Sequence, residues 1–537
     1  MKRSSSKILK YILLVYLMIT VVVPIVVLFS QIRPENIKSV FTSAQFIPML
    51  KNSVLTTLIA TVISVALAFA LAYAVNRSGV KFKSFWMMLF TIPMLIPSIS
   101  HGMGLVLLFG DNGLITNLLG LRIDLYGYVG IIMGSVLYSF PVAFLMFFDS
   151  LQYEDYTTYE AAEVLGMSKL RMFKTITIPS MKRTLVSAVL AVFTMVFTDY
   201  GVPLMTGGTV MTLPVYMYRE VIGMMNFSNG AVIGVILLAP AIIAFLMDLK
   251  KSNAVSVSTV TKPFKITENR ARDIGAYAFL IISLLIMCLP IIAFACLSFV
   301  RQYPIDMTFT LDNIKKLVSN GIGMYFVNSI SIALLTALVG TAFAYFAAYC
   351  TSRSGKSVPN QLMHFVSMLP LAVPGVVLGL SYVMSFKNMP FYGTIFILVI
   401  VNIVHFFSSP YLMAYNSLSK FNPNLEDVAH TLGISRMRML ISVYVPSTVY
   451  TIIEMYSYFF VNAMITISAV SFLINFRTMP LSLMIPQLES QSFIEGTAIV
   501  SLLILVLNLV EKGIAFFAKR AVTKQNEKIA AEPEIKL

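Results

Sequence analysis

Charged residues are scarce in this sequence of 537 residues. Asp, Glu, Lys and Arg together make up 12% of the chain, about half the share found in soluble globular proteins. Hydrophobic residues reach 58%. Runs of about 20 mostly apolar residues recur along the whole length, and each is long enough to cross a bilayer core of ~30 Å. No soluble domain fits between these runs, so the composition predicts an all-α integral membrane protein.

Cysteine and histidine are also rare, with three and four residues. The cysteines lie in apolar stretches and show neither metal-ligand spacing nor a disulfide framework. No two histidines stand at the spacing of a metal site. We therefore expect no metal site and no cofactor bound by this chain.

A nucleotide-binding loop is missing as well. The nearest approach to a P-loop is Gly355-Lys356-Ser357, but the motif needs a glycine at the position of Cys350, and the segment follows an apolar run rather than a strand. The net charge of +15 is what cytoplasmic loops of a membrane protein require, so it does not indicate nucleic-acid binding. We expect neither catalysis nor ATP hydrolysis by this chain.

The apolar runs predict about twelve transmembrane helices. Prolines inside them are tolerated in membrane helices and predict kinks, as at Pro93, Pro97, Pro370 and Pro374. The predicted spans lie near 11–30, 50–76, 84–109, 128–149, 182–205, 231–249, 275–299, 325–350, 360–386, 392–413, 449–475 and 497–517.

Basic residues fix the expected orientation. With a cytoplasmic N-terminus, most of the 39 Lys and Arg residues fall on segments that this map places inside, including the polar stretch 250–273 and the C-terminal tail 521–537. Such an excess follows the positive-inside rule. We therefore predict that both termini lie in the cytoplasm.

The sequence contains an internal repeat. Residues 52–79 align without gaps on 328–355, and residues 151–179 align in the same way on 418–446. Six helices per copy is an even number, so both copies enter the membrane in the same sense and form parallel repeats. The predicted organisation is a first half at 1–249, a cytoplasmic linker at 250–273, a second half at 274–520 and a tail at 521–537.

One loop inside each half carries the same pattern. Residues 159–180 and 426–447 each predict a short helix, a break and a second short helix. A glycine can end the first helix, a serine two residues later can cap the second, and a proline fits where that helix must stop. Apolar side chains such as Ala162, Leu165, Leu170 and Phe173 predict one buried face. The bland alternative is a pair of interfacial helical turns, but recurrence at fixed spacing favours a docking surface.

These loops resemble the EAA loop of permease subunits in binding-protein-dependent ABC importers. That pattern is Glu-Ala-Ala, three residues, Gly, nine residues and Ile-x-Leu-Pro. The first copy matches at Glu160, Ala161, Ala162, Gly166 and Pro179. The second copy is degenerate and matches at Asp427, Ala429, Gly433 and Pro446.

The resemblance implies a fold, partners and a location. It implies the type I ABC importer permease fold, and a chain with both halves resembles the fused permeases for iron(III), thiamine and 2-aminoethylphosphonate. In that family the loop forms a coupling helix that inserts into a groove of the ATPase. We therefore expect two ATPase copies on 155–180 and 422–447, an extracytoplasmic substrate-binding protein, ATP use by the partner alone, and a place in the bacterial plasma (inner) membrane.

Few polar residues lie at membrane depth, so each is a candidate for the transport path. Asp199, Tyr200, Thr466 and Ser468 follow the coupling loops and are the expected lining of a path between the halves. The alternative is that Asp199, like Glu454, lies near a helix end and is simply solvated or paired.

Two other functions remain open at this point. A gradient-driven secondary transporter with 6+6 helices would also have parallel halves, but it usually needs intramembrane charged relays, in which this chain is poor. A membrane scaffold without transport would not require the repeat. The sequence does not name the substrate, because specificity in such importers rests largely with the binding protein.

Overall fold

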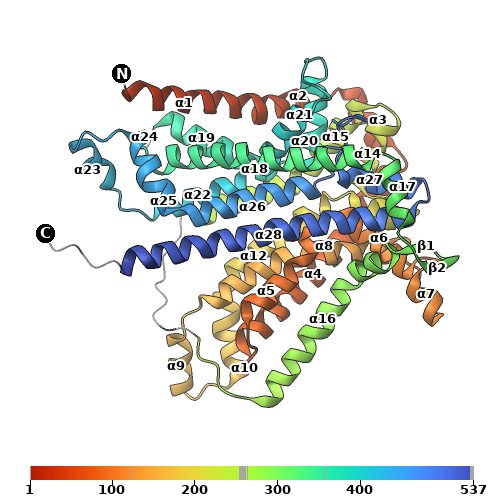
Figure 1. Ribbon diagram of the computed structural model, residues 1–537, viewed down its shortest axis with the longest axis horizontal. Coiled ribbons are helices and arrows are strands. Elements are labelled where there is room, and N and C mark those ends of the chain that lie inside the picture. The colour runs from red at the N-terminus through yellow and green to blue at the C-terminus, as the bar shows by residue number, and fades with distance from the viewer. Residues whose placement is uncertain (1, 121–122, 253–261, 263, 356, 532–537) are drawn as a thin grey trace.

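The computed structural model describes residues 2–120, 123–252, 262, 264–355 and 357–531, and most of them are helical (Figure 1). The first half comprises α1 (Lys2–Leu17), the π-turn η1 (Met18–Val22), α2 (Val23–Ser30), α3 (Pro34–Thr42), α4 (Phe46–Arg77), α5 (Lys83–Thr91), η2 (Ile92–Leu95), α6 (Ser98–Phe109), α7 (Leu114–Leu119), α8 (Tyr128–Gln152), α9 (Thr157–Val164), α10 (Lys169–Met172), η3 (Phe173–Thr177), α11 (Ile178–Ser180), α12 (Lys182–Phe197), α13 (Gly201–Thr206), α14 (Leu213–Tyr218), η4 (Arg219–Gly223) and α15 (Phe227–Ser252).

The second half follows the same order and adds a small hairpin. It comprises α16 (Arg270–Leu297), β1 (Val300–Gln302), β2 (Asp306–Phe309), α17 (Asp312–Ser319), α18 (Ile322–Ser352), α19 (Val358–Met368), η5 (Leu369–Ala372), α20 (Gly375–Phe386), α21 (Ile395–His405), α22 (Ser408–Ser419), α23 (Leu425–Thr431), α24 (Arg436–Met439), η6 (Leu440–Tyr444), α25 (Val445–Ser447), α26 (Val449–Ile465), α27 (Leu481–Ser490) and α28 (Ile494–Ala531). Strands β1 and β2 pair antiparallel.

The predicted membrane architecture is confirmed. Among the described residues, eight helices are long and apolar enough to cross a membrane, and up to twelve if each bent helix pair counts as one span. The kink predicted at Pro370 and Pro374 is confirmed. At 360–386 the chain turns by 113° between η5 and α20, where Pro370 and Pro374 withhold backbone N–H groups from a continuous helix.

Three predicted boundaries differ from the observed ones. The spans at 182–205 and 449–475 end early, because α12 stops at Phe197 and α26 at Ile465. In each case the chain continues as turns and short helices, α13 and α14 after α12 and α27 after α26. The last helix is longer than the predicted span, since α28 continues to Ala531 and makes the first part of the predicted tail helical.

Identical residues in the two copies make equivalent hydrogen bonds. Asn52 in α4 donates a hydrogen bond to the carbonyl of Met211 at 3.0 Å, and Asn328 in α18 donates to that of Arg477 at 2.8 Å. The serine after each asparagine accepts from the first backbone N–H of α14 or α27, at 2.8 and 2.7 Å. Backbone polar groups inside a bilayer need partners from the protein, so these side chains hold the irregular segments against the long helices.

The first helix of each half crosses to the other half. Helices α1 and α2 lie along α19 and α20 (Figure 1), and the Tyr382 hydroxyl donates to the carbonyl of Thr20 at 2.7 Å. Helix α16 in turn packs on α6, where an added Cβ on Gly104 would lie 3.0 Å from the Cα of Pro290. The two halves are therefore interlocked.

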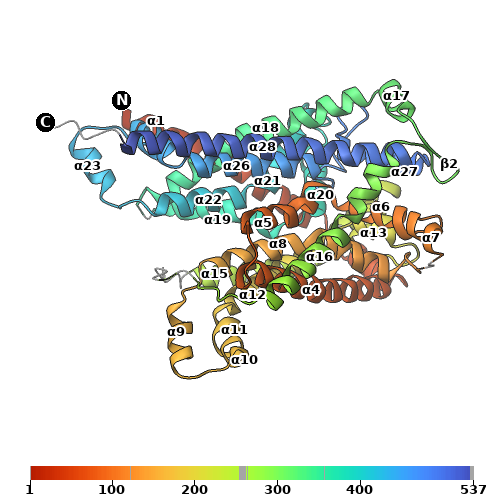
Figure 2. The same cartoon turned by 60° about the horizontal axis from the view of Figure 1, so that its bottom comes forward.

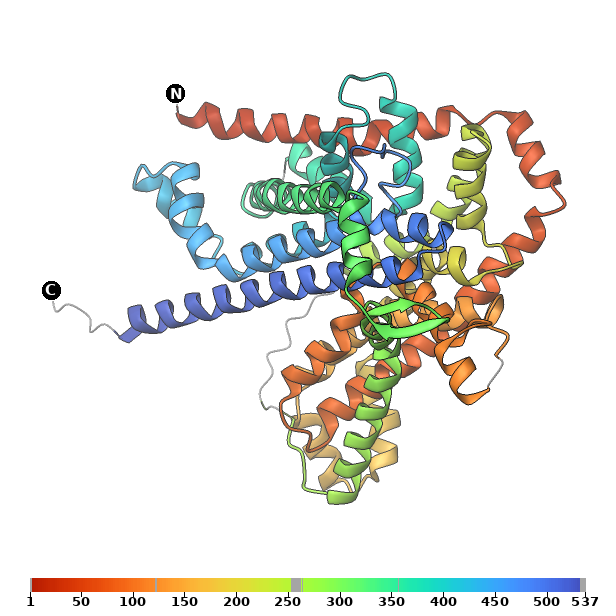
Figure 3. The same cartoon turned by 45° about the vertical axis from the view of Figure 1, so that its right-hand side comes forward.

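The start of α1 and the end of α28 lie at the same end of the molecule as the two loops with the repeated pattern (Figure 1). Figure 2 shows α9, α10 and α11 projecting below the long helices, and α23 projecting beside the termini. The hairpin β1–β2 and α17 lie at the opposite end, which Figure 3 turns toward the viewer.

Candidate functional site

The two loops fold alike. Each contains a short helix, a left-handed glycine, a capped second helix, a π-turn and a three-residue helix that begins near a proline. Gly166 has φ +69° and Gly433 has φ +66°, a conformation that favours glycine. The hydroxyl of Ser168 accepts from the N–H of Arg171 at 3.4 Å, and Ser435 caps α24 in the same way at 3.3 Å.

In each loop the second helix ends just past its proline, as the spacing predicted. Helical segments run without a break from Lys169 to Ser180 and from Arg436 to Ser447, so Pro179 and Pro446 each lie one residue before the end. The chain then bends, by 62° before α12 and by 82° before α26. Each proline thus stands just before the corner at which the loop joins its membrane helix.

Only some of the apolar residues that were predicted to form a buried face in the first loop are buried. Ala162 is 4% exposed and lies in a small core with Tyr156, Tyr159 and Met172. Leu165 and Leu170, expected on that buried face, are 75% and 65% exposed. These two bulky apolar side chains therefore lie on the surface of the projecting loop and not in its core.

The second loop presents an equivalent surface. Its exposed apolar side chains include Val428, Leu432, Ile434, Ile441 and Val443. Ala429 is buried like Ala162, while Asp427 is exposed like Ala161.

A buried arginine anchors each loop to its own half. Arg77, at the end of α4, pairs with Glu154, and Arg353, just after α18, pairs with Glu426 at 2.6 Å. Both guanidinium side chains are 5% exposed. The two arginines occupy the same position of the repeat, so this anchor could be read from the sequence as an identity, although the partner carboxylates could not, because they stand at different positions.

The acidic residue of the first EAA pattern faces the linker. Glu160 accepts from Lys262 Nζ at 2.7 Å. Phe264 lies over the Arg77 guanidinium, with 3.6 Å between Cζ and the ring centroid, and meets Tyr156 and Tyr159 edge-on. Burial raises the pKa of Tyr159 to about 12, so its phenol stays neutral and shares a hydrogen bond with Thr177 at 2.8 Å.

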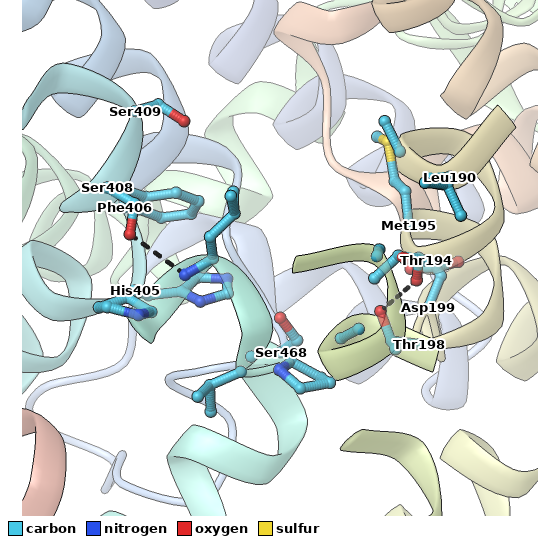
Figure 4. A pocket seen from close by; sticks show the side chains of 18 of the residues that line it. Leu190, Thr194, Met195, Thr198, Asp199, His405, Phe406, Ser408, Ser409 and Ser468 are labelled. Atoms are coloured by element: carbon cyan, nitrogen blue, oxygen red, sulfur yellow. Dashed lines mark hydrogen bonds between the residues drawn. The ribbon is translucent and has the colours of Figure 1, made fainter. Parts of the chain in front are cut away.

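A cavity of about 470 Å³ lies between the halves. Figure 4 shows the end of α12, with Thr194, Thr198 and Asp199, on one side, and His405 with Ser408 on the other. Two of the four predicted path residues, Asp199 and Ser468, line this cavity.

The other two predicted path residues lie in packed surroundings. Tyr200 is 2% exposed and stacks on Tyr218 at 4.9 Å between ring centroids. Thr466 is 7% exposed, and its carbonyl accepts from the hydroxyl of Ser482 at 2.8 Å. Sequence reasoning missed His405, Tyr138 and Tyr458, which line the cavity from helices that carry no motif.

Asp199 both caps a helix and lines the cavity. Its carboxylate accepts from the N–H groups of Gly201 at 3.3 Å and Val202 at 3.0 Å, so it caps α13 as the alternative reading required. It is also the one carboxylate among the described residues that line the cavity, and no Lys or Arg lines it. Glu454, by contrast, pairs with Lys519 of α28 away from the cavity.

The family model for binding-protein-dependent transport system inner membrane components matches residues 64–249 and 340–524, one match in each half. These ranges contain both repeated loops. The chain belongs to this family. The permease fold that the sequence indicated is therefore established by the family, by the two repeats and by the helical architecture.

Relatives of this permease include two ferric transport proteins. The ferric transport system permease protein FbpB of Actinobacillus pleuropneumoniae is 24% identical over 406 residues, which cover 72% of this chain and 59% of that protein. The putative ferric transport system permease protein FbpB 1 of Haemophilus influenzae is 23% identical over 465 residues, 83% and 73% of the two chains. The thiamine transport system permease protein ThiP of Brucella suis is 30% identical over 142 residues, 25% and 26% of the two chains.

Proposed function

We propose that this chain is the permease subunit of an ATP-driven importer for a small cation. The observation that carries the proposal is the pair of projecting loops with one architecture, each anchored by a buried arginine and each exposing apolar side chains. A transporter driven by an ion gradient has no need for two such surfaces. One ATPase subunit would dock on each loop, and ATP would be used there, not by this chain.

The expected orientation follows from charge and topology. The basic N-terminus, the C-terminal end of α28 and both loops gather at one end of the molecule (Figure 1), and basic segments stay cytoplasmic. The opposite end would receive a substrate-binding protein outside a bacterial plasma membrane. Closure of the ATPases would draw the loops together and shift the cavity from inward-open to outward-open states.

The cavity favours a cation. It carries one carboxylate and no cationic side chain among its described lining residues, so a phosphonate anion would find no partner charge there. The names of the relatives agree with this chemistry, since ferric ion and thiamine are both cations. Iron(III) and thiamine are therefore the candidates to test first.

Uptake by cells that express the complete transport system tests the proposal. We expect ATP-dependent accumulation of radioactive iron or thiamine that persists when a proton uncoupler is added and ATP is held constant. Uptake abolished by the uncoupler at constant ATP would instead favour a gradient-driven carrier. Accumulation of a phosphonate but of neither cation would contradict the assignment of substrate charge.

A further inference from the structure

A second cavity, of about 230 Å³, lies where α18 ends, beside the second coupling loop. Its charged lining residues are Lys10 of α1 and Arg436 of α24, and its polar lining includes Ser354, Ser357 and Asn360. No carboxylate is found among the described residues that line it. Since a water takes ~30 Å³ of liquid volume, the space admits several waters or one phosphate group.

The internal repeat shows what occupies the matching place in the first half. Ser354 and Gly355 align with Ser78 and Gly79. The N–H of Gly79 donates to Asp273 Oδ1 at 2.8 Å, and a Cβ on Gly79 would collide with that carboxylate. A Cβ on Gly355 would meet nothing within 4 Å. The first half therefore fills this site with its own anion, and the second half leaves it open.

The crossing helices contribute opposite charges to the two sites. Asp273 lies in the first turn of α16, the crossing helix that opens the second half. The crossing helix that opens the first half is α1, and it contributes Lys10 to the open site. Arg436, whose Nη1 donates to Ser354 Oγ at 3.3 Å, aligns with Lys169 of the first loop. The open site thus has two cations in place of a built-in carboxylate.

From this contrast we infer that the cavity binds an anionic phosphate group. Two cationic side chains and two hydroxyls are the groups that hold phosphates. Lys10 lies at the start of the first membrane span, Ile8–Ser30, which puts the cavity at the depth of lipid headgroups, where basic pockets between helices bind anionic lipids. A bound phosphate would join α1 to α24 and so fix the second coupling loop to the crossing helix, as Asp273 fixes α16 to the α4–α5 turn.

Lipid retention by the purified full-length chain tests this inference. Native mass spectrometry would compare phosphatidylglycerol with zwitterionic phosphatidylcholine, and inorganic phosphate would be added in a separate series. The variants are Lys10→Asp, which supplies the missing carboxylate, together with Lys10→Gln and Arg436→Gln, which remove one charge each. Lys169→Gln is the matched control, because it removes the equivalent charge from the first loop.

We expect the dissociation constant for phosphatidylglycerol to rise at least tenfold in the three site variants and to stay unchanged in Lys169→Gln. Competition by millimolar inorganic phosphate, lost in the same variants, would also support the site and would identify a soluble source for the phosphate. Equal binding of both lipids by the native chain without any phosphate binding would overturn the inference. The same holds if the site variants, eluting as the native protein does from a sizing column, bind phosphatidylglycerol unchanged.

Discussion

The hydroxyl of Tyr444 donates a hydrogen bond of 2.5 Å to Glu426 across the second coupling loop. The aligned positions in the first loop are Thr177 and Tyr159, and these two also bond to one another, at 2.8 Å. The tyrosine stands at the later of the two positions in the second loop and at the earlier one in the first loop, yet the two positions are hydrogen-bonded in both copies. This bond ties the first helix of each loop to its π-turn.

Variants of Glu426 and of its neighbour Asp427 test whether the ion pair between Arg353 and Glu426 anchors the second loop. Glu426→Ala leaves the buried Arg353 without its carboxylate, which costs on the order of 3 kcal/mol when a buried pair is broken. Asp427→Ala removes an exposed charge and should cost less than ~0.5 kcal/mol. Thermal unfolding in detergent should show a clear drop for the first variant only. Equal melting temperatures for the two variants would show that the Arg353 pair does not anchor the loop.

The left-handed glycines make a second prediction. Gly166→Ala and Gly433→Ala meet no atoms within 4 Å, so their cost is that of backbone conformation, about 1–2 kcal/mol per residue. Asparagine tolerates this conformation, so Gly166→Asn should transport better than Gly166→Ala. The control is Gly223→Ala, which also meets no atoms and has no positive φ. We expect uptake by whole cells to fall in Gly166→Ala and Gly433→Ala and to stay near normal in Gly223→Ala. Equal loss of uptake in all variants, the control included, would show that the left-handed conformation of these glycines does not determine transport.

The linker contact predicts unequal effects at two neighbouring positions. The Lys262–Glu160 pair is exposed on both sides, and such pairs contribute about 0–1 kcal/mol, so Lys262→Ala should leave stability and uptake nearly unchanged. Phe264→Ala removes the ring that lies on Arg77, Tyr156 and Tyr159, and should cost about 2–3 kcal/mol. Proteolysis at the first loop would report the difference as faster cleavage of the Phe264 variant. Faster cleavage of the Lys262 variant would contradict this ranking.

A variant of Asp199 tests whether the substrate is a cation. Asp199→Asn keeps an oxygen that can cap α13 but removes the negative charge. We expect the KM for a cationic substrate to rise on the order of tenfold, since a hydrogen bond to a charged group contributes about 1.5–3 kcal/mol. Glu454→Gln removes a carboxylate away from the cavity and serves as the control. An unchanged KM in Asp199→Asn with normal folding would assign this residue to capping alone.

The sequence was informative where local chemistry dictates structure. Gly166 and Gly433 could be predicted to end helices because only glycine adopts that conformation freely, and Ser168 and Ser435 could be predicted as caps from their spacing. The identity of Asn52 and Asn328 across the aligned copies likewise corresponds to equivalent hydrogen bonds to the backbone. The apolar runs likewise predicted the membrane spans.

Tertiary relationships could not be read in the same way. Nothing local distinguishes Tyr200, which is packed in the core, from Asp199 beside it, which reaches the cavity, because the difference arises where α12 ends and the chain turns. Leu165 looks like a core residue, but its side chain is 75% exposed on a projecting loop. His405 carries no motif and enters the cavity only because α21 and α22 bend by 52°.

The measurement that tests the central claim most directly is purification of the tagged chain in mild detergent from its native host, followed by identification of what accompanies it. We predict a P-loop ATPase at two copies per chain, and its loss when Gly166 and Gly433 are both replaced by proline while the chain still inserts in the membrane. A chain that purifies alone across several gentle detergents, or that keeps the ATPase after both replacements, would contradict the account.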